Sequence, residues 1–453
     1  MVCVEVHGSR QSGHCCWMLE TQLAHTHTWP HGSRTWLASA SMHTTHSFSS
    51  LISGRPSRVP RAPPRTPRCL PACLGRPAAR AHMGSSWMLV LAGFGIILVV
   101  VLTTNMLAPQ FAYAEVASAP RKLLPTDSVL VTGGAGFVGF HLASRLKRDG
   151  VRVVAIDDFN PYYSTALKRA RAAHLRGWGV EVLEGDVCDA ELLGTLFVRH
   201  GLTHVAHLAA QAGVRYSLAQ PQSYMRNNLQ CFVALLETHR RFPNVKLVYA
   251  SSSSVYGANT KTPFSEADRV DSPNSLYAAS KRANEAIAHV YHGLYQIPVT
   301  GLRFFTVYGP WGRPDMAYFS FTHRISQGRP IQVYGHGAPL RDFTYIDDVV
   351  EGIVAALALG ADEELFNLGN HRTESLMRFI EVIERELGVR ANKTMSAMAP
   401  GDVLATYADV SHARERLGYR PRTSIDVGLR KFISWYRSDQ FRQEFAEEGE
   451  WRK

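Results

Sequence analysis

The sequence predicts an α/β fold: a doubly wound parallel sheet with helices on both faces, followed by a smaller α/β domain. From residue 128 onward, short apolar runs alternate with amphipathic stretches. The runs are apolar at successive positions, which is typical of strands buried on both faces of a parallel sheet. Strands that alternate with helices indicate the same architecture. No internal repeat suggests a solenoid instead.

The expected elements follow one another in a regular order. Strands are predicted at 128–132, 151–156, 180–183, 204–208 and 246–250, and helices at 138–148, 228–241 and 277–295. We expect the sheet domain to span 127–310 and the smaller domain to span mainly 311–443, with some interleaving of segments.

The first 82 residues have a different composition. They are rich in Ser, His, Trp, Arg and Pro and lack sustained periodicity. We therefore expect residues 1–82 to be disordered, or to be a spurious extension upstream of Met83. They hold nine arginines, no lysine and only two acidic residues, and so carry most of the formal net charge of +11. A charge confined to such a tail does not indicate that the folded part binds nucleic acid.

Residues 87–107 form an apolar segment of 21 residues without a charge. As a helix, this segment is long enough to span a bilayer about 30 Å thick. We therefore predict a transmembrane helix at 87–107, followed by a stem at 108–126. A cleaved signal peptide is the alternative, because Ala112-Tyr113-Ala114 resembles a cleavage site, but the apolar run is longer than the core of a usual signal peptide. The arginines that precede the segment favour an N-terminus in the cytosol.

Only two cysteines, Cys188 and Cys231, lie after residue 82; the other five lie in the tail. Two such residues make no disulfide framework, and no spacing of Cys and His resembles a metal site. We expect both to be buried free thiols, and we expect no bound metal.

A glycine-rich turn follows the first predicted strand, where the sequence 132–139 is TGGAGFVG. Gly133, Gly136 and Gly139 permit a tight turn, close approach of a pyrophosphate and close packing of the next helix. The N–H groups at the start of that helix favour phosphate. Asp157 ends the second strand, where its carboxylate would accept from adenosine ribose hydroxyls and repel a 2′-phosphate. The sheet is therefore predicted to be a Rossmann-type domain that binds NAD rather than NADP.

Tyr277 and Lys281 are the predicted catalytic pair. They lie four residues apart on the predicted helix 277–295, so the phenol and the ammonium share one face. We expect the ammonium and a positively charged nicotinamide to lower the pKa of the phenol from about 10 towards neutral pH. Residues 251–254 are all serine and follow a strand at the carboxyl edge of the sheet, where such folds bind ligands.

Together these motifs resemble the extended short-chain dehydrogenase/reductase family, and within it the nucleotide-sugar epimerases. TGGAGFVG, the serine-rich strand end before Val255-Tyr256-Gly257, and Tyr277-x-x-x-Lys281 occur in the family's order and spacing, and the resemblance covers residues 128–435. It implies that Ser252 is catalytic together with Tyr277 and Lys281. It also implies cofactor contacts from Gly133, Gly136, Phe137, Val138, Gly139, Asp157, Asp186, Val187, Leu208, Ala209, Ala210, Asn228, Tyr277 and Lys281, with Asp186 and Val187 beside the adenine and Asn228 near the substrate.

The neighbours of this set indicate which reaction takes place after oxidation of the sugar. Dehydratases and UDP-xylose-forming decarboxylases of the family typically carry an acidic residue immediately before Val-Tyr-Gly, where this chain has Ser254. Ser253 and Ser254 would donate hydrogen bonds to a substrate carboxylate, which a Glu would repel. The segment around Thr306 and Arg313 resembles that of UDP-glucuronate 4-epimerases, whereas UDP-glucose 4-epimerases usually carry Asn at 306. Arg313 and Arg341 are expected to pair with the diphosphate or the carboxylate; a surface ion pair is the alternative for either.

The resemblance therefore implies NAD-dependent 4-epimerisation of UDP-glucuronate to UDP-galacturonate, similar to that of plant enzymes with an N-terminal membrane anchor. UDP-glucose 4-epimerisation, decarboxylation of UDP-glucuronate, and a catalytically idle NAD-binding scaffold are the alternatives. The resemblance also implies a homodimer formed through the helices at 228–241 and 277–295. It further implies a location in the Golgi membrane, with a single span and the catalytic domain in the lumen.

Overall fold

The computed structural model describes residues 122–398, 402–439 and 441. The chain divides into two units, Met1–Phe94 and Gly95–Lys453, and every helix and strand of the described residues belongs to the second. The predicted extension at 1–82 and the predicted transmembrane helix at 87–107 lie outside the described residues, as does most of the predicted stem. Within the described residues, no helix is both long enough and apolar enough to cross a membrane.

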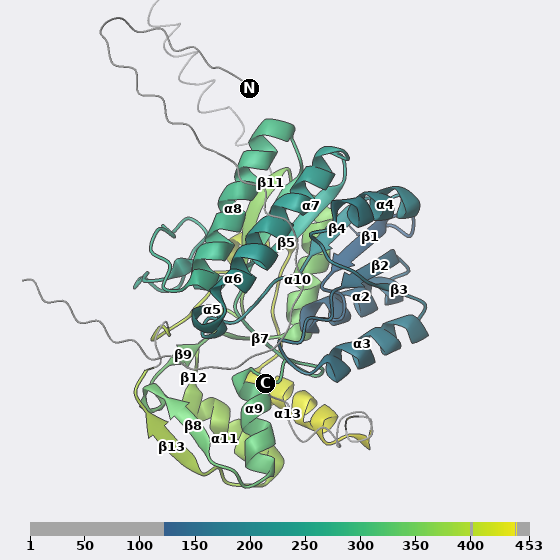
Figure 1. Cartoon of the computed structure of the whole chain (residues 1–453). Coiled ribbons are helices and arrows are strands. Elements are labelled where there is room, and N and C mark those ends of the chain that lie inside the picture. Colours follow the sequence, from purple (N-terminus) through teal and green to yellow (C-terminus); the bar gives the residue numbers. More distant parts are fainter. Residues whose placement is uncertain (1–121, 399–401, 440, 442–453) are drawn as a thin grey trace, which may run out of the picture. The chain divides into compact units, whose positions relative to one another are not determined.

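Seven parallel strands form the central sheet, in the order β11-β6-β5-β4-β1-β2-β3 (Figure 1). They are β1 (Ser128–Thr132), β2 (Arg152–Asp157), β3 (Glu181–Glu184), β4 (His204–His207), β5 (Lys246–Ser252), β6 (Val299–Phe304) and β11 (Glu363–Leu368). All five predicted strands are present, and the doubly wound parallel sheet is confirmed. The strand order reverses between β1 and β4, which is the point at which such sheets bind ligands.

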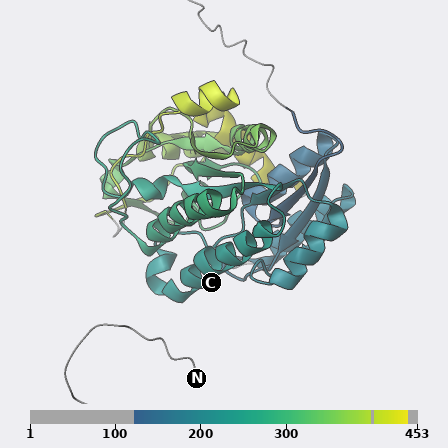
Figure 2. The same ribbon diagram turned by 90° about the horizontal axis from the view of Figure 1, so that it is seen from above.

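Helices cover both faces of this sheet (Figure 1, Figure 2). One face packs against α2 (Phe137–Arg148), α3 (Thr165–Gly177) and α10 (Ile346–Leu359), and the other against α4 (Ala190–His200), α7 (Cys231–Arg240) and α8 (Leu276–Tyr295). Val129 and Val131 of β1 belong to the first core, whereas Leu130 belongs to the second. A strand buried on both faces explains why the sequence is apolar at successive positions.

The smaller domain is built on two-stranded sheets. β7 (Thr306–Tyr308) pairs with β10 (Phe343–Tyr345), β9 (Leu340–Arg341) with β12 (Glu374–Ser375), and β8 (Ile331–Tyr334) with β13 (Lys393–Ser396). Three helices accompany them, α9 (Ala317–Ser326), α11 (Leu376–Leu387) and α13 (Ile425–Tyr436), whereas α12 (Ser411–Leu417) packs against α10 and β11 of the central sheet domain. The rings of Phe319 on α9 and Phe432 on α13 have centroids 5.6 Å apart. Because β11 returns to the central sheet between β10 and β13, the two parts interleave.

Short helical segments lie next to the ends of β4, β5 and β8. Between β4 and α7 the chain forms α5 (Tyr216–Ala219), α6 (Pro221–Tyr224) and the π-helix η1 (Met225–Gln230). The helix predicted to begin at 228 therefore starts within a π-helix, a geometry that occurs frequently at functional sites. The 3₁₀ turns η2 (Ser253–Tyr256) and η3 (Gly335–Gly337) follow β5 and β8.

Candidate active site

The glycine-rich turn between β1 and α2 forms a close backbone cradle. Gly133 has a φ of +68°, and a Cβ built there would lie 2.8 Å from the amide nitrogen of Ala209. A Cβ on Gly139 would lie 2.1 Å from the carbonyl oxygen of Gly133, so the helix packs on the turn as predicted. No side chain caps the start of α2, which leaves the N–H groups of its first turn available to a phosphate. The turn therefore fits the pyrophosphate of a dinucleotide.

Thr132 joins the carboxyl ends of β1 and β4. Its Oγ1 accepts hydrogen bonds from the backbone N–H groups of Leu208 and Ala209, both at 3.2 Å, and lies 2.9 Å from Nδ1 of His207. Burial lowers the pKa of His207 to about 3, so this histidine is neutral at physiological pH. The backbone at 208–210, predicted to run along the cofactor, is thereby fixed next to the glycine turn.

Asp157 is buried at the end of β2 and supports the same turn. Its Oδ2 accepts from the N–H of Ala135 at 3.0 Å, and its Oδ1 accepts from the N–H of Phe159 at 2.9 Å. Nζ of Lys168 lies 3.9 Å from Oδ1. Burial raises the pKa of Asp157, and the charge of Lys168 acts against this rise. The predicted ribose acceptor thus also holds the glycine turn, and Lys168 is a site residue that was not predicted from the sequence.

One cavity of about 1420 Å³ connects the glycine turn with the carboxyl ends of β4 and β5 and with the smaller domain. The predicted residues that line it are Gly133, Gly136, Phe137, Val138, Gly139, Asp157, Asp186, Val187, Leu208, Ala209, Ala210, Ser252, Ser253, Ser254, Tyr277, Lys281, Thr306, Arg313 and Arg341. Among the predicted site residues Asn228 is the exception, and its neighbour Asn227 lines the cavity instead.

Asn228 lies in the π-helix η1, behind the cavity wall. Its Oδ1 accepts from the N–H of Gln211 at 2.8 Å, and its Nδ2 donates to the carbonyl oxygen of Gln211 and to Oγ of Ser280, both at 3.0 Å. Both amide N–H groups are therefore used within the protein. The resemblance implied that Asn228 contacts the cofactor; in the structure it fixes the backbone of Gln211, which does line the cavity.

The start of α8 positions the catalytic pair. Ser275 caps the helix by accepting from the N–H of Ala278 at 3.1 Å. The helix therefore begins immediately before Tyr277, and Lys281 follows one turn later on the same face. Ser252 ends β5 and lines the same cavity, so the three predicted catalytic residues converge from two elements.

Burial also determines the protonation of this pair. It lowers the pKa of Lys281 to about 8, although the charge of Glu285 acts against this fall. Nζ of Lys281 donates to the carbonyl oxygen of Ala250 at 2.8 Å. Burial raises the pKa of Tyr277, whereas a hydrogen bond with Ser252 and the charge of Arg313 act against that rise. This direction is opposite to the one expected from the Tyr/Lys pair, because burial of the phenol outweighs the neighbouring groups of the chain.

A buried ion pair supports the serine-rich strand end from behind. Oε1 of Glu285 accepts from Oγ of Ser251 at 2.6 Å and from Nε of Arg303 at 2.9 Å, while Oε2 accepts from Nη2 of Arg303 at 2.9 Å. Arg303 also donates to the hydroxyl of Tyr256 at 3.1 Å. These bonds hold β5, β6 and α8 together at the site. Glu285 was not predicted from the sequence, although its position four residues after Lys281 places it on the catalytic face of the helix.

The two predicted substrate arginines have different partners. Nε and Nη2 of Arg313 donate to the two carboxylate oxygens of Asp315 at 3.1 and 2.6 Å, and the hydroxyl of Tyr162 donates to Asp315 at 3.0 Å. Burial acts to lower the pKa of Arg313, but the negative charge and hydrogen bonds of Asp315 outweigh it and raise that pKa. Nη1 of Arg341 donates to the carbonyl oxygens of Leu340 and Leu404 at 2.9 and 3.2 Å. The ion pair considered as an alternative is thus present at Arg313, within the cavity wall rather than on open surface.

Known proteins are similar to the part of the chain that contains this site. A family model described as the NAD dependent epimerase/dehydratase family matches residues 129–369. The chain belongs to this family. UDP-glucuronate 4-epimerase 4 from Arabidopsis thaliana is 50% identical over 329 residues, which cover 69% of this chain and 75% of the relative. Protein CapI from Staphylococcus aureus is 44% identical over 326 residues, which cover 68% of this chain and 98% of the relative.

Solved structures of the epimerase family have the same fold. A UDP-glucuronic acid 4-epimerase from Bacillus cereus, in complex with UDP-glucuronic acid and NAD, is 35% identical, with a TM-score of 0.64 over 68% of this chain and 98% of that chain. A UDP-glucose 4-epimerase from Thermotoga maritima, with UDP-glucose, is 28% identical, with a TM-score of 0.62 over 68% and 98%. The resemblance to nucleotide-sugar epimerases is confirmed, and NAD is the cofactor of the family.

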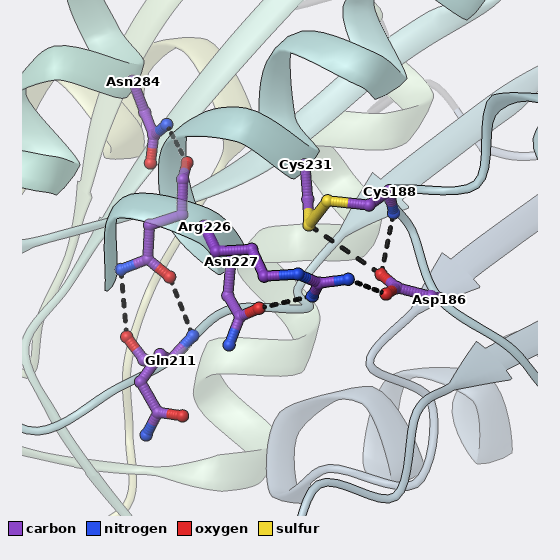
Figure 3. Close-up of a disulfide and its surroundings, with 8 residues drawn as sticks. Asp186, Cys188, Gln211, Arg226, Asn227, Cys231 and Asn284 are labelled. Atoms are coloured by element: carbon purple, nitrogen blue, oxygen red, sulfur yellow. Dashed lines mark hydrogen bonds and ion pairs between the residues drawn. A yellow bond between two sulfur atoms is a disulfide. The ribbon is translucent and has the colours of Figure 1, made fainter. Parts of the chain in front are cut away.

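The prediction for the two cysteines of this epimerase-family domain was wrong. Cys188 and Cys231 form a disulfide (Figure 3) instead of free thiols. Cys188 follows β3 and Cys231 opens α7, 43 residues later, so only the tertiary fold brings them together. The carboxylate of Asp186 lies close to both sulfur atoms, but disulfide sulfurs are not the thiolates that bind metals.

Proposed function

We propose that the chain is an NAD-dependent UDP-glucuronate 4-epimerase, which interconverts UDP-glucuronate and UDP-galacturonate. The proposal rests chiefly on the cavity, which contains both the dinucleotide turn and the catalytic residues Ser252, Tyr277 and Lys281. Ser254, in the turn after β5, also lines it. Dehydratases and decarboxylases of the family typically carry an acidic residue at that position. Relatives support it: the Arabidopsis relative carries this name, and the Bacillus cereus neighbour holds UDP-glucuronic acid and NAD.

NAD supplies the acceptor and donor of the hydride at C4 of the sugar. Residues along one wall of the cavity are suited to bind NAD. The glycine turn and the N-terminus of α2 would hold the pyrophosphate, and Asp157 would accept from the adenosine ribose. Asp186 and Val187 also line the cavity and would lie beside the adenine, and the lining residues 208–210 would lie along the cofactor.

Tyr277 acts as the general base and then as the general acid. As the phenolate, it would take the proton of the C4 hydroxyl when the sugar is oxidised, and as the phenol it would return that proton after the sugar ring has turned over. Because burial raises the pKa of Tyr277, the phenolate depends on positive charge nearby. The charge of Arg313 and the hydrogen bond with Ser252 both act to lower the pKa of the phenol, and Lys281 would add its charge from the same helix face.

The carboxylate of the substrate sets a second requirement. The 4-keto form of UDP-glucuronate is a β-keto acid, which tends to lose carbon dioxide. Hydroxyls of Ser253, Ser254 and Thr306 line the cavity and can donate to the carboxylate. Those hydrogen bonds would hold it away from the geometry that breaks its bond to C5. A neutral donor set also adds no acid or base next to the intermediate.

Incubation of the full chain with UDP-glucuronate and NAD tests the proposed reaction. The expected product is UDP-galacturonate, without net reduction of NAD. UDP-xylose with carbon dioxide as the main product would refute the epimerase in favour of a decarboxylase. Conversion of UDP-glucose alone would indicate a UDP-glucose 4-epimerase, and no turnover despite bound NAD would indicate an idle scaffold.

We also propose that residues 87–107 anchor the protein in the Golgi membrane, with the catalytic part in the lumen. The uncharged apolar sequence supports the anchor, and the disulfide is in keeping with an oxidising compartment. The proposed assembly is a homodimer through α7 and α8. Val290 and Leu294 on α8 are 50% and 67% exposed, and a partner helix would cover them. The proposed division of labour assigns NAD to residues 127–310 and the sugar mainly to 311–443.

A further inference from the structure

The π-helix η1 lies between the catalytic helix and the adenine end of the cavity. On the side of α8, Nδ2 of Asn284 donates to the carbonyl oxygen of Asn228 at 2.6 Å, and Nδ2 of Asn228 donates to Oγ of Ser280 at 3.0 Å. All three residues are buried, and Ser280 immediately precedes Lys281. This side of η1 is therefore fixed to the helix that carries the catalytic pair.

The other side of η1 is tied to the loop that follows β3 (Figure 3). Arg226, in η1, forms an ion pair with Asp186. The disulfide joins Cys231, directly after η1, to Cys188. Within the loop, Oδ1 of Asp186 accepts from the N–H of Cys188 at 2.8 Å. The loop and η1 therefore meet through one ion pair and one covalent bond.

These ties hold a part of the cavity wall. Asp186, Val187, Asn227 and Cys231 all line the cavity at the end where the adenine is expected. The side chains of Arg226 and Asp186 are 51% and 37% exposed, and an ion pair with that exposure is screened by solvent and salt and contributes little. The disulfide, with Cys231 buried, is therefore the stronger of the two ties.

We propose that Cys188 and Cys231 are positioning residues for NAD, because their disulfide holds the adenine-binding loop against the helix that is fixed to the catalytic pair. Opening the bond leaves the loop at 186–188 joined to η1 only through the exposed ion pair, while the contacts of Asn228 and Asn284 with α8 stay in place. The adenine end then loosens, whereas the catalytic end keeps its geometry. The inference rests on the proposed binding of NAD, which an epimerase must retain from one turnover to the next.

The chemical change is a thiol–disulfide exchange with a small dithiol. Two electrons and two protons pass from the dithiol to the protein, the bond between the two sulfur atoms breaks, and two cysteine thiols form. The dithiol is oxidised to its own disulfide. Cys188 is only half-buried, so a small reagent can reach the bond.

The experiment compares the oxidised and dithiol-treated full chain. NAD retained after desalting is measured first, and then kcat and the KM for added NAD with UDP-glucuronate as substrate. Thiol titration reports whether the bond has opened. Treatment should lower the retained NAD and raise the KM for NAD several-fold, while kcat at saturating NAD changes little. A bond that only stabilised the fold would instead lower kcat and the thermal midpoint together.

Two variants complete the test. Cys188→Ser combined with Cys231→Ser should show the high KM for NAD in either condition and should not respond to the dithiol, which controls for reduction elsewhere in the chain. Arg226→Gln should have a smaller effect than loss of the disulfide.

Equal NAD retention and equal KM in the oxidised and reduced wild-type protein would overturn the proposal, as would titratable thiols at both positions in the oxidised protein. If NAD retention responds but no form epimerises UDP-glucuronate, the proposed function fails and the positioning role stands.

Discussion

In the proposed reaction, Tyr277 would act at C4 of the sugar and Ser254 at the carboxylate on C5. Oxidation at C4 would use Tyr277, Lys281, Ser252 and NAD, and it is the first step of several reactions of this family. We expect the residue at 254 to influence the fate of the keto intermediate, because a carboxylate there would serve as a further acid or base next to it. With hydroxyls at 253 and 254, return of the hydride and the proton to C4 is the step that the site favours.

Tyr277→Phe removes the proton-transfer group and little else. Positioned acid–base groups typically contribute about 10²–10⁴-fold to the rate, so kcat should fall by about that factor. Retained NAD should not change, because the ring stays in place. The measurement is UDP-galacturonate formation together with the ratio of NAD to protein. Full activity in this variant would contradict the assignment of Tyr277 as the base.

The pKa of Lys281 predicts an alkaline limit to activity. Burial lowers that pKa to about 8, so the ammonium is present below about pH 8 and is lost as the pH rises through this value. Because the ammonium stabilises the phenolate, kcat/KM should fall over the same interval. The pH profile of kcat/KM measures this limb. Lys281→Arg is the matched variant, since a guanidinium does not titrate near pH 8. If kcat/KM still falls above pH 8 in this variant, the fall belongs to another group.

At the scale of elements, α3 connects the two halves of the site through a buried arginine. Arg171 is fully buried, and its acceptors are neutral. Nη1 donates to the carbonyl oxygen of Ala135 in the glycine turn and to the hydroxyl of Tyr163, at 3.0 and 2.8 Å. Nε donates to the carbonyl oxygen of Trp311 at 3.0 Å, and Nη2 to that of Gly312 at 3.1 Å. One guanidinium therefore joins the cofactor turn to the segment that leads into Arg313.

Arg171→Lys should disrupt this connection, because one ammonium cannot reach acceptors on both segments. A buried group left without its hydrogen bond costs about 1–3 kcal/mol, so the free energy of unfolding in urea should fall by at least that amount. The KM for UDP-glucuronate should rise, since the segment before Arg313 loses its support. Arg169→Lys is the control on the same helix. Its ion pair with Glu184 is half-exposed, so the free energy of unfolding should change far less than it does in Arg171→Lys.

The elements differ in how far the sequence predicted them. β1 was predictable because burial on both faces leaves a local signal, the apolar run Val129–Leu130–Val131. The glycine turn and the Tyr/Lys spacing are local as well. The orientation of Asn228 was not predictable, because a π-helix and an α-helix direct the same residue to different sides. Nothing near Arg171 or Glu285 in the sequence marks the hydrogen-bond partners that the fold brings to them.

At the scale of the whole molecule, contact between distant segments could not be predicted. The disulfide joins residues 43 positions apart, and β11 enters the central sheet from within the smaller domain. Such pairings are decided by the packing of the complete chain, so no window of sequence contains them. Membrane orientation is also a property of the whole chain, and one exposed loop of the smaller domain can report it.

That loop, between α11 and β13, ends at Asn392, which together with Lys393 and Thr394 at the start of β13 forms the only Asn-x-Ser/Thr sequence in the chain. The carbonyl oxygen of Asn392 accepts from the N–H of Ile331 at 2.8 Å, while the residue itself is exposed. Figure 1 places β13 away from α7 and α8, the proposed dimer helices. A glycan at Asn392 would therefore meet neither of those helices.

If the catalytic part lies in the lumen, Asn392 is exposed to N-glycosylation. The full chain expressed in eukaryotic cells should show one discrete mobility shift on treatment with peptide N-glycosidase. Asn392→Gln and Thr394→Ala should abolish the shift, whereas Thr394→Ser should retain it, because serine also completes the acceptor sequence. Epimerase activity of Asn392→Gln should match that of the wild type, since the residue does not line the cavity.

Digestion of intact vesicles with protease distinguishes the remaining outcomes. The orientation in the membrane determines whether Asn392 can be glycosylated, whether the disulfide can form and whether the protease can reach the catalytic part. If the catalytic part is protected from protease but shows no mobility shift, it is lumenal and unmodified, and only the prediction of a glycan at Asn392 is contradicted. If the catalytic part is digested and shows no mobility shift, it is cytosolic, and the proposed lumenal location is contradicted. In that orientation glutathione would also keep Cys188 and Cys231 as thiols, so thiol labelling before lysis should give the same answer as the protease.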